Sequence, residues 1–215
     1  MFKALARALW LLLGWTELIL FTLILYLLSY LPDSWLGPWY RRLFQAWSRT
    51  WVHALGVDLR LHHKNAHPLP DRFILIANHP SAFEDVGIPS LFDVDNLAKE
   101  EVRQWWMVGR IGAAAGTIFV RRESRESRAE AAQQIERHLA AGRNIALYPE
   151  GGIKGPWLQP AFRYGAFGIS LQTGIPIVPV YLHYEALLDF HWGRHSLIHN
   201  MRNIMNDRNN RANYY

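Results

Sequence analysis

The sequence predicts an α/β fold in which a mixed, partly parallel central sheet is flanked by helices and preceded by an N-terminal two-helix, membrane-embedded motif. Three observations support this prediction. Short apolar segments alternate with helical segments, which is typical of sheets whose strands are joined by helices. An apolar run fills residues 8–30 almost without interruption. Polar or charged residues directly follow three apolar segments, at the strand ends where such sheets carry their sites.

The composition limits the class of protein. The 215 residues suffice for one domain of ordinary size with an appendage. A formal charge of +5 favours an anionic partner, such as a membrane surface, a phosphorylated substrate or nucleic acid. Nucleic acid is the weakest of these candidates, because the arginines accompany membrane signals. The absence of cysteine excludes disulfides, thiolate catalysis and zinc sites built on cysteine.

The N-terminal apolar run, over about residues 5–30, predicts a membrane helix. A bilayer-spanning helix needs roughly 20 apolar residues. A secretory signal would have a shorter apolar core and a small-residue cleavage site, whereas this run ends in Leu-Ser-Tyr-Leu-Pro. Glu17 lies inside the run, where a carboxylate at mid-bilayer costs roughly 2.5–3.5 kcal/mol. We expect it to face another helix or to be protonated.

A second, amphipathic helix is predicted over about residues 34–55, after the break at Pro32. Its aromatic stripe and its arginines are typical of a helix at the membrane interface, although the same stripe suits packing on the protein's own domain. Basic residues flank the first helix on both sides, so the positive-inside rule gives no orientation. The first helix either spans the bilayer or forms with the second a hairpin that dips into one leaflet. The stripe consists of Trp39, Leu43, Trp47, Trp51 and Leu55.

The remaining chain alternates between two kinds of segment. Apolar segments predict strands at 57–61, 73–77, 117–120, 144–148 and 177–182. Helical character predicts helices at 97–106, 125–141 and 161–172, and a run of small residues predicts a turn at 112–116. The Asn-rich tail at 200–215 predicts no clear element and is consistent with partial disorder.

A histidine and two acids follow the second predicted strand. His79 comes directly after this strand and one asparagine, and Glu84 and Asp85 lie a few residues further on. Imidazole titrates near neutral pH and a carboxylate can fix its tautomer, so this is the minimum equipment for removing a proton from a hydroxyl. Alone, a histidine after a strand is usually a turn residue. Arg122 and Glu150 follow two other strands, so three such loops are expected to meet at one sheet edge.

Four sequence blocks follow one another in a specific order. They are Asn-His-Pro-Ser-Ala-Phe-Glu-Asp at 78–85, the segment 97–122, Tyr-Pro-Glu-Gly-Gly at 148–152, and residues 162–166 with 177–180. Through these blocks, residues 57–182 resemble the glycerophospholipid acyltransferase superfamily of the lysophosphatidate (1-acylglycerol-3-phosphate) type, with its motif of a histidine, four residues and an acid. The resemblance implies an acyltransferase domain at 57–199, after a membrane-associated helical hairpin at 1–56 and before the tail at 200–215.

The chain departs from the family pattern at two places. Glu84 stands at the family's usual acid position, and Asp85 lies one residue further on. Glu84 is favoured by its register as the partner of the histidine, with Asp85 as the rival. Gly152 and Ile153 replace the threonine and arginine that are usual after the third block, and Lys154 is a candidate to supply the lost charge.

The resemblance also implies an activity. The expected reaction moves a fatty acyl group from an acyl thioester, carried by coenzyme A or acyl carrier protein, to the hydroxyl of a lysophospholipid, without a covalent intermediate. The first expected acceptor is 1-acylglycerol-3-phosphate, which would give phosphatidic acid; another lysolipid is the alternative. No cofactor is expected. The expected location is the cytoplasmic face of a bacterial inner membrane. A membrane-anchored lipid-binding module without chemistry is the non-enzymatic alternative.

The expected site residues follow from the four blocks. His79 is the expected general base, with Glu84 or Asp85 orienting it, and Arg122 is expected to hold an acceptor phosphate. Arg121 stands where the family often has aspartate, and Lys99 also suits a surface charge. The residues expected to contact substrate are Asn78, Ser81, Lys99, Arg121, Arg122, Glu150, Gly151, Gly152 and Lys154.

Two other classes of enzyme fit the sequence poorly. A serine hydrolase would need Gly-x-Ser-x-Gly, which is missing. A metal site would draw on two histidine sets, but Gly193 weakens a helix through one set and the chain contains no His-Glu-x-x-His. We therefore expect no metal. The two sets are His191, His195 and His199, and His62, His63 and His67.

Overall fold

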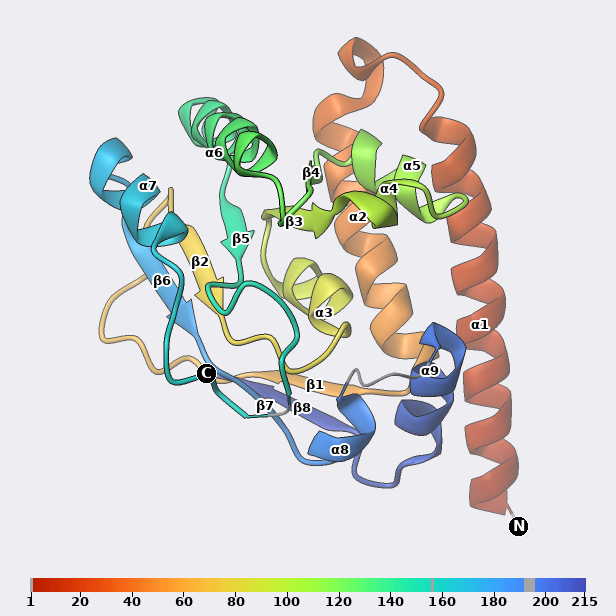
Figure 1. Cartoon of the computed structure of the whole chain (residues 1–215). Coiled ribbons are helices and arrows are strands. Elements are labelled where there is room, and N and C mark those ends of the chain that lie inside the picture. Colours follow the sequence, from red (N-terminus) through yellow and green to blue (C-terminus); the bar gives the residue numbers. More distant parts are fainter. Residues whose placement is uncertain (1, 156, 192–195) are drawn as a thin grey trace.

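The computed structural model describes residues 2–155, 157–191 and 196–215. It contains a five-stranded sheet, a separate three-stranded sheet and an N-terminal pair of long helices that stands beside them (Figure 1). The predicted mixed, partly parallel α/β fold with helices around the sheet is confirmed.

The five-stranded sheet has the order β4-β3-β5-β2-β6, and every neighbouring pair is parallel. All five strands therefore end at the same edge, which is where an open parallel sheet positions a site. The interior strand β2, which lies between β5 and β6, is buried throughout its length, which explains its uninterrupted apolar sequence. The strands are β2 Ile74–Ala77, β3 Asp95–Lys99, β4 Ile118–Val120, β5 Ile145–Leu147 and β6 Ile177–Val180.

Alternation along β2 assigns its side chains to two cores. Ile74 and Ile76 face the layer formed by α6 and α7, whereas Leu75 and Ala77 face α3 and the second sheet. Each core is closed by apolar side chains of the covering helices, such as Ile135 of α6. The helices after the hairpin are α3 Glu84–Leu91, α4 Glu100–Arg103, α5 Val108–Ala114, α6 Arg125–Ala140, α7 Gly165–Thr173, α8 Leu187–Phe190 and α9 Leu197–Asn206.

The three-stranded sheet has the order β1-β8-β7 and uses the C-terminal segment as its middle strand. β8 (Arg211–Tyr214) is parallel to β1 (Asp58–Leu61) and antiparallel to β7 (Leu182–Tyr184). The expectation that residues 200–215 form no clear element is therefore wrong. The tail contains the end of α9 and a paired strand, and its Tyr214 is fully buried with its hydroxyl against Gly87 of α3. The sequence did not predict this strand for two reasons. Its asparagines interrupt the apolar pattern of a strand, and its pairing partners lie far away in the sequence.

Two local predictions also need correction. Residues 97–99 belong to strand β3 and not to a helix, and only the short α4 follows them. β3 pairs with β4 on one side and with β5 on the other, so long-range pairing outweighs the local helical pattern. The predicted turn at 112–116 begins later than expected, since α5 continues to Ala114 and the chain turns at Gly116 with φ of 93°.

The N-terminal helices α1 (Phe2–Leu28) and α2 (Asp33–Ala54) form an antiparallel pair, with α2 between α1 and α3 (Figure 1). The segment Leu5–Leu28 is long and apolar enough to cross a membrane, and most of its side chains are exposed. The aromatic stripe of α2 is divided: Trp47 is buried against α1, whereas Trp39 is exposed. The stripe therefore both packs on the protein and faces outward.

Polar side chains also make contacts between the two helices. Trp47 Nε1 donates a hydrogen bond of 2.8 Å to Thr22 Oγ1. Glu17 Oε2 lies 3.4 Å from His53 Nδ1 of α2, as expected for an acid that faces another helix.

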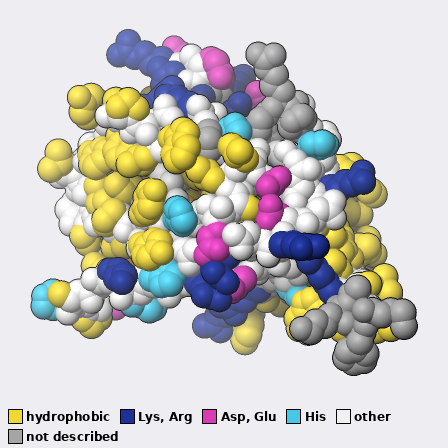
Figure 2. Space-filling model, turned by 90° about the horizontal axis from the view of Figure 1, so that it is seen from below, with side chains coloured by type: hydrophobic (Ala, Val, Ile, Leu, Met, Phe, Trp, Pro, Cys, Tyr) yellow, Lys and Arg dark blue, Asp and Glu magenta, His cyan; other side chains and the backbone are white. Residues whose placement is uncertain are grey.

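Seen from below, the molecule shows hydrophobic patches on its left and right sides with charged side chains and histidines between them (Figure 2).

Candidate active site

The loops after β2, β4 and β5 meet at the carboxyl edge of the parallel sheet. The backbone N–H of His79 donates to Glu150 Oε2 at 3.0 Å, which joins the β2 and β5 loops. Arg122 Nη1 donates to the Gly151 carbonyl at 3.1 Å, which joins the β4 and β5 loops. These two contacts bring together residues from three of the four sequence blocks.

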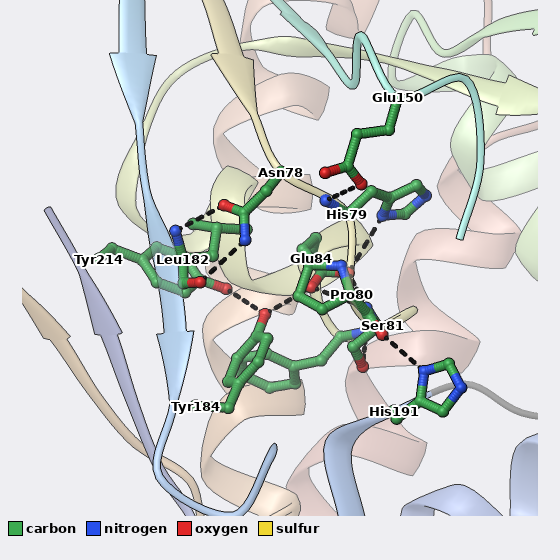
Figure 3. A network of polar contacts seen from close by, with 11 residues as sticks. Asn78, His79, Pro80, Ser81, Glu84, Glu150, Leu182, Tyr184, His191 and Tyr214 are labelled. Atoms are coloured by element: carbon green, nitrogen blue, oxygen red, sulfur yellow. Dashed lines mark hydrogen bonds and ion pairs between the residues drawn. The ribbon is translucent and has the colours of Figure 1, made fainter. Parts of the chain in front are cut away.

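His79 and Glu84 form a buried pair at the centre of this edge (Figure 3). His79 Nδ1 lies 3.2 Å from Glu84 Oε2. Glu84 begins α3 and also accepts hydrogen bonds from the Ser81 N–H at 3.0 Å and from the Tyr184 hydroxyl at 2.7 Å. With several donors around one fully buried carboxylate, both of its oxygens are fixed in place.

This arrangement fixes the tautomer and plane of the His79 ring. With Glu84 ionised, its carboxylate accepts at Nδ1, so the proton of neutral His79 resides there and the lone pair lies on Nε2. The Tyr148 ring stacks on the imidazole at 4.1 Å between centroids and 13° between planes. Nε2 is therefore the atom that can accept a proton from a bound hydroxyl.

Burial controls the protonation of the pair. Burial lowers the pKa of His79, and Arg122 lowers it further, while Asp85 and Glu150 act in the opposite direction. Burial raises the pKa of Glu84 well above its usual range, although the hydrogen bond from Tyr184 opposes this. The imidazole is consequently a free base at neutral pH, as proton abstraction requires.

Asp85, the rival acid, lies one residue further along α3. Its side chain keeps contact with solvent, unlike that of Glu84. Desolvation by the surrounding protein nevertheless raises the pKa of Asp85 to about 6, with a further contribution from Glu84, while His79 and Arg122 oppose the increase. Asp85 therefore acts on the site through its charge, whereas the hydrogen bond to the imidazole comes from Glu84.

Asp85→Asn tests this charge through the pH dependence of stability. An acid whose pKa is higher in the folded protein binds more protons there, so the wild-type free energy of unfolding falls as pH rises from about 4 to about 6. The variant lacks this titration. We expect its Tm to exceed that of wild type at pH 7–8, with the difference disappearing near pH 4, in thermal unfolding followed by circular dichroism. An equal difference at both pH values would contradict the assignment.

Glu150 connects two loops. It is buried; its Oε2 accepts the His79 N–H, and its Oε1 accepts the Gln159 N–H at 3.1 Å. Each carboxylate oxygen therefore binds a backbone N–H, one in the loop after β2 and one at Gln159. The first of these hydrogen bonds positions the backbone of His79.

Asn78 and Ser81 hold the same loop from within. The Asn78 side chain makes two hydrogen bonds with the backbone of Leu182, at 2.9 and 2.7 Å, and so ties the loop to β7. Ser81 Oγ accepts the Phe83 N–H at 3.1 Å at the start of α3. Both side chains are buried, so the geometry gives them a role in positioning the His79 loop.

The basic residues predicted from sequence fall in different places. Arg122 lies against the glycine turn, whereas Arg121 and Lys154 are exposed and Lys99 is exposed at the end of β3. Arg163, which lies in the fourth sequence block but was not predicted as a site residue, is the residue that packs against Gly151. The sequence feature that could have identified Arg163 is its position in the fourth block, shortly before the start of α7.

Tyr184, Tyr214 and His191 were also missed. Tyr184 bonds Glu84 and lies 3.3 Å from the Tyr214 hydroxyl, and His191 Nδ1 lies 3.3 Å from the Pro80 carbonyl (Figure 3). No sequence block contains them.

Of the histidines weighed as metal ligands, His195 lies outside the described residues. Within the described ranges, no group of three potential ligands is gathered.

With this geometry in place, the chain can be compared with known proteins. The family model described as Acyltransferase matches residues 59–183, which is more than half of the chain. The chain belongs to the acyltransferase family. The predicted membership of the glycerophospholipid acyltransferase superfamily is thereby confirmed.

Curated relatives of this chain carry the names of acyltransferases for more than one lysolipid. A lyso-ornithine lipid O-acyltransferase of Pseudomonas aeruginosa is 29% identical over 155 residues, covering 72% of this chain and 58% of the relative. A 1-acyl-sn-glycerol-3-phosphate acyltransferase of Neisseria gonorrhoeae is 28% identical over 116 residues, covering 54% of this chain and 45% of the relative. The chain therefore spans about half the length of these relatives.

A solved structure shares the fold of this chain. The crystal structure of the 1-acyl-sn-glycerophosphate (LPA) acyltransferase PlsC from Thermotoga maritima matches with a TM-score of 0.65 and 19% identity. The match covers 89% of this chain and 80% of that one, so the likeness extends over the sheet and well beyond the family-model region. At this level of identity it shows the fold alone.

Proposed function

We propose that the protein is a membrane-associated O-acyltransferase that moves a fatty acyl group from an acyl thioester to the hydroxyl of a lysolipid. The observation that carries the proposal is the buried His79–Glu84 pair, whose geometry leaves Nε2 of His79 as the proton acceptor. It stands at the loop edge where Arg122 approaches the glycine turn. A base beside a guanidinium suits a hydroxyl substrate that carries an anionic group.

The proposed reaction needs a single displacement. The acceptor hydroxyl oxygen forms a bond to the thioester carbonyl carbon while Nε2 of His79 takes the hydroxyl proton. The carbon–sulfur bond then breaks, and the proton passes from His79 to the leaving thiolate, giving an ester and a free thiol. Glu84 stabilises the transient imidazolium through Nδ1. Because the thioester is already activated, neither a covalent intermediate nor a cofactor is required.

The first acceptor we propose is 1-acylglycerol-3-phosphate, which would give phosphatidic acid. The name of the Neisseria gonorrhoeae relative supports it, as does Arg122, since a guanidinium matches a phosphate with two parallel hydrogen bonds. Either coenzyme A or acyl carrier protein would serve as the thioester carrier.

A second candidate acceptor carries both an anion and an ammonium group, as a lyso-ornithine lipid does. Asp85 favours it, because a solvent-accessible carboxylate within electrostatic range of Arg122 and His79 can attract an ammonium group. The name of the Pseudomonas aeruginosa relative points the same way. A phosphate monoester alone would bring no cation to that carboxylate.

Membrane attachment through α1 fits substrates that remain in the bilayer. A soluble enzyme would have to extract each acyl chain at a cost of about 0.8 kcal/mol per CH₂. An enzyme anchored by the apolar Leu5–Leu28 segment needs to lift only the head group. We propose that the domain faces the cytoplasm, where the thioester donors are available.

A substrate panel tests the proposal. The full chain in phospholipid nanodiscs is given radiolabelled acyl-CoA or acyl-ACP with 1-acylglycerol-3-phosphate, lyso-ornithine lipid or lysophosphatidylcholine, and labelled product is separated by thin-layer chromatography. We expect diacyl product from at least one of the first two acceptors. Binding of these lipids without turnover by either donor would instead identify a lipid-binding module.

A further inference from the structure

Two arginines approach the glycine turn after β5. Gly151 and Gly152 have φ of 78° and 151°, a region that favours glycine. A methyl group on Gly151 would collide with the Arg163 side chain, and one on Gly152 would lie 2.9 Å from Arg122 Nη1. Two consecutive residues must therefore lack a Cβ for both guanidinium groups to lie where they do.

Backbone contacts hold the two arginines beside this turn. The Arg163 N–H donates to the Pro149 carbonyl at 2.7 Å, and Arg122 Nη1 donates to the Gly151 carbonyl at 3.1 Å. Burial lowers the pKa of Arg122 and the nearby Arg163 lowers it further, whereas Asp85 and Glu123 oppose this. Two like charges at such range repel each other, and an anion that contacts both removes the repulsion.

Both arginines also line a cavity of about 180 Å³ between the sheet and the helices α6 and α7. Arg128 contributes a third guanidinium, and no aspartate or glutamate of the described chain belongs to the lining. The other walls are mainly apolar and come from β3, β4, β5, α6 and α7. This combination suits an amphiphile with an anionic head and an apolar body. The apolar lining includes Leu97, Val120, Ala131, Ile135, Leu147 and Ile169.

We propose that Arg163 and Arg122 form a two-arginine clamp for the anionic head group of the acceptor lysolipid. The proposal rests on the proposed function and adds a specificity-determining residue to it. Arg163 supplies the charge that is missing at Ile153, because its guanidinium packs over Gly151 from the next sequence block. Arg122 lies deeper and Arg163 is exposed, so the clamp is open to a head group that arrives from solvent or from the membrane surface.

Kinetics of Arg163→Ala test the clamp. With 1-acylglycerol-3-phosphate we expect KM to rise about 10–100-fold, as for the loss of a charge-assisted hydrogen bond, with little change in kcat. With monoacylglycerol, which offers a hydroxyl without an anion, we expect KM to stay within about twofold. Arg163→Lys should be intermediate, because an ammonium cannot bond in the same two-pronged way. A rise confined to the KM of the acyl-CoA donor would overturn the proposal.

A binding measurement separates the clamp from the activity. Glycerol 3-phosphate is expected to raise the Tm of wild type and of the exposed α6 control Arg137→Ala, but not that of Arg163→Ala. Equal stabilisation of all three would overturn the clamp. If wild type acylates lysolipids and Arg163→Ala behaves identically, the clamp fails and the proposed function stands. If wild type acylates none of them, the proposed function itself fails.

Discussion

Replacing His79 with Ala is expected to lower the rate of acyl transfer by about 10²–10⁴-fold, the usual contribution of a positioned general base. Nε2 of His79 is the atom that the Glu84 contact and the Tyr148 stacking leave free to accept the hydroxyl proton. The variant removes this acceptor but leaves Glu84 bonded to Ser81 and Tyr184. The loss should therefore appear in kcat with the best acceptor found in the substrate panel.

The controls distinguish lost chemistry from lost structure. His79→Gln keeps most of the side-chain volume under Tyr148 and should be as inactive as His79→Ala. His183→Ala removes an exposed histidine of β7 and should keep wild-type activity. All three variants are expected to bind nanodiscs like wild type, since α1 is unchanged. Acyl transfer within about threefold of wild type by His79→Ala would exclude His79 as the base.

The second large effect is expected from the acid that contacts His79. Glu84→Gln should lower kcat about 10²–10⁴-fold, because a carboxamide can present its N–H₂ to Nδ1 and so move the imidazole proton to Nε2. Asp85→Asn leaves that hydrogen bond intact. It should keep kcat at neutral pH within about tenfold of wild type and move the acidic limb of kcat/KM to lower pH, because the Asp85 carboxylate raises the pKa of His79.

The sign of that pH shift is a specific test. His79 must be neutral to act, so activity is lost as pH falls through its pKa, which burial already lowers. Removing a nearby negative charge lowers this pKa further. A larger loss of kcat in Asp85→Asn than in Glu84→Gln, at equal thermal stability, would make Asp85 the orienting acid and contradict the geometry.

The sequence predicted the position of the site well because the relevant information is local. The apolar strand before Asn78 and His79 is buried on both faces, and such a strand reads as an unbroken hydrophobic run. Once the strands are parallel, their following loops must meet, and the contacts from His79 to Glu150 and from Arg122 to Gly151 bear this out. The order of the sequence blocks along the chain therefore indicated which loops lie together.

What the sequence did not reveal depends on distant partners. The strand β8 is stabilised by pairing with β1 and β7 and not by its own Arg-Ala-Asn-Tyr pattern. Helical spacing did not choose between Glu84 and Asp85, because His79 precedes the helix and only the folded loop brings Glu84 to Nδ1. Arg163, and not the predicted Lys154, lies beside Gly151, because the long side chain of Arg163 reaches from the fourth sequence block over the glycine turn.

The strand β8 links the catalytic acid to the order in which the protein is made. Tyr214 lies against α3 and contacts the Tyr184 hydroxyl that bonds Glu84, so the surroundings of this acid are completed by one of the last residues of the described chain. The apolar helix α1 precedes β8 in the chain and so leaves the ribosome before it. The apolar helix can thus engage a membrane while the acid proposed to orient His79 still lacks its final support, which would separate membrane insertion from the proposed activity in time.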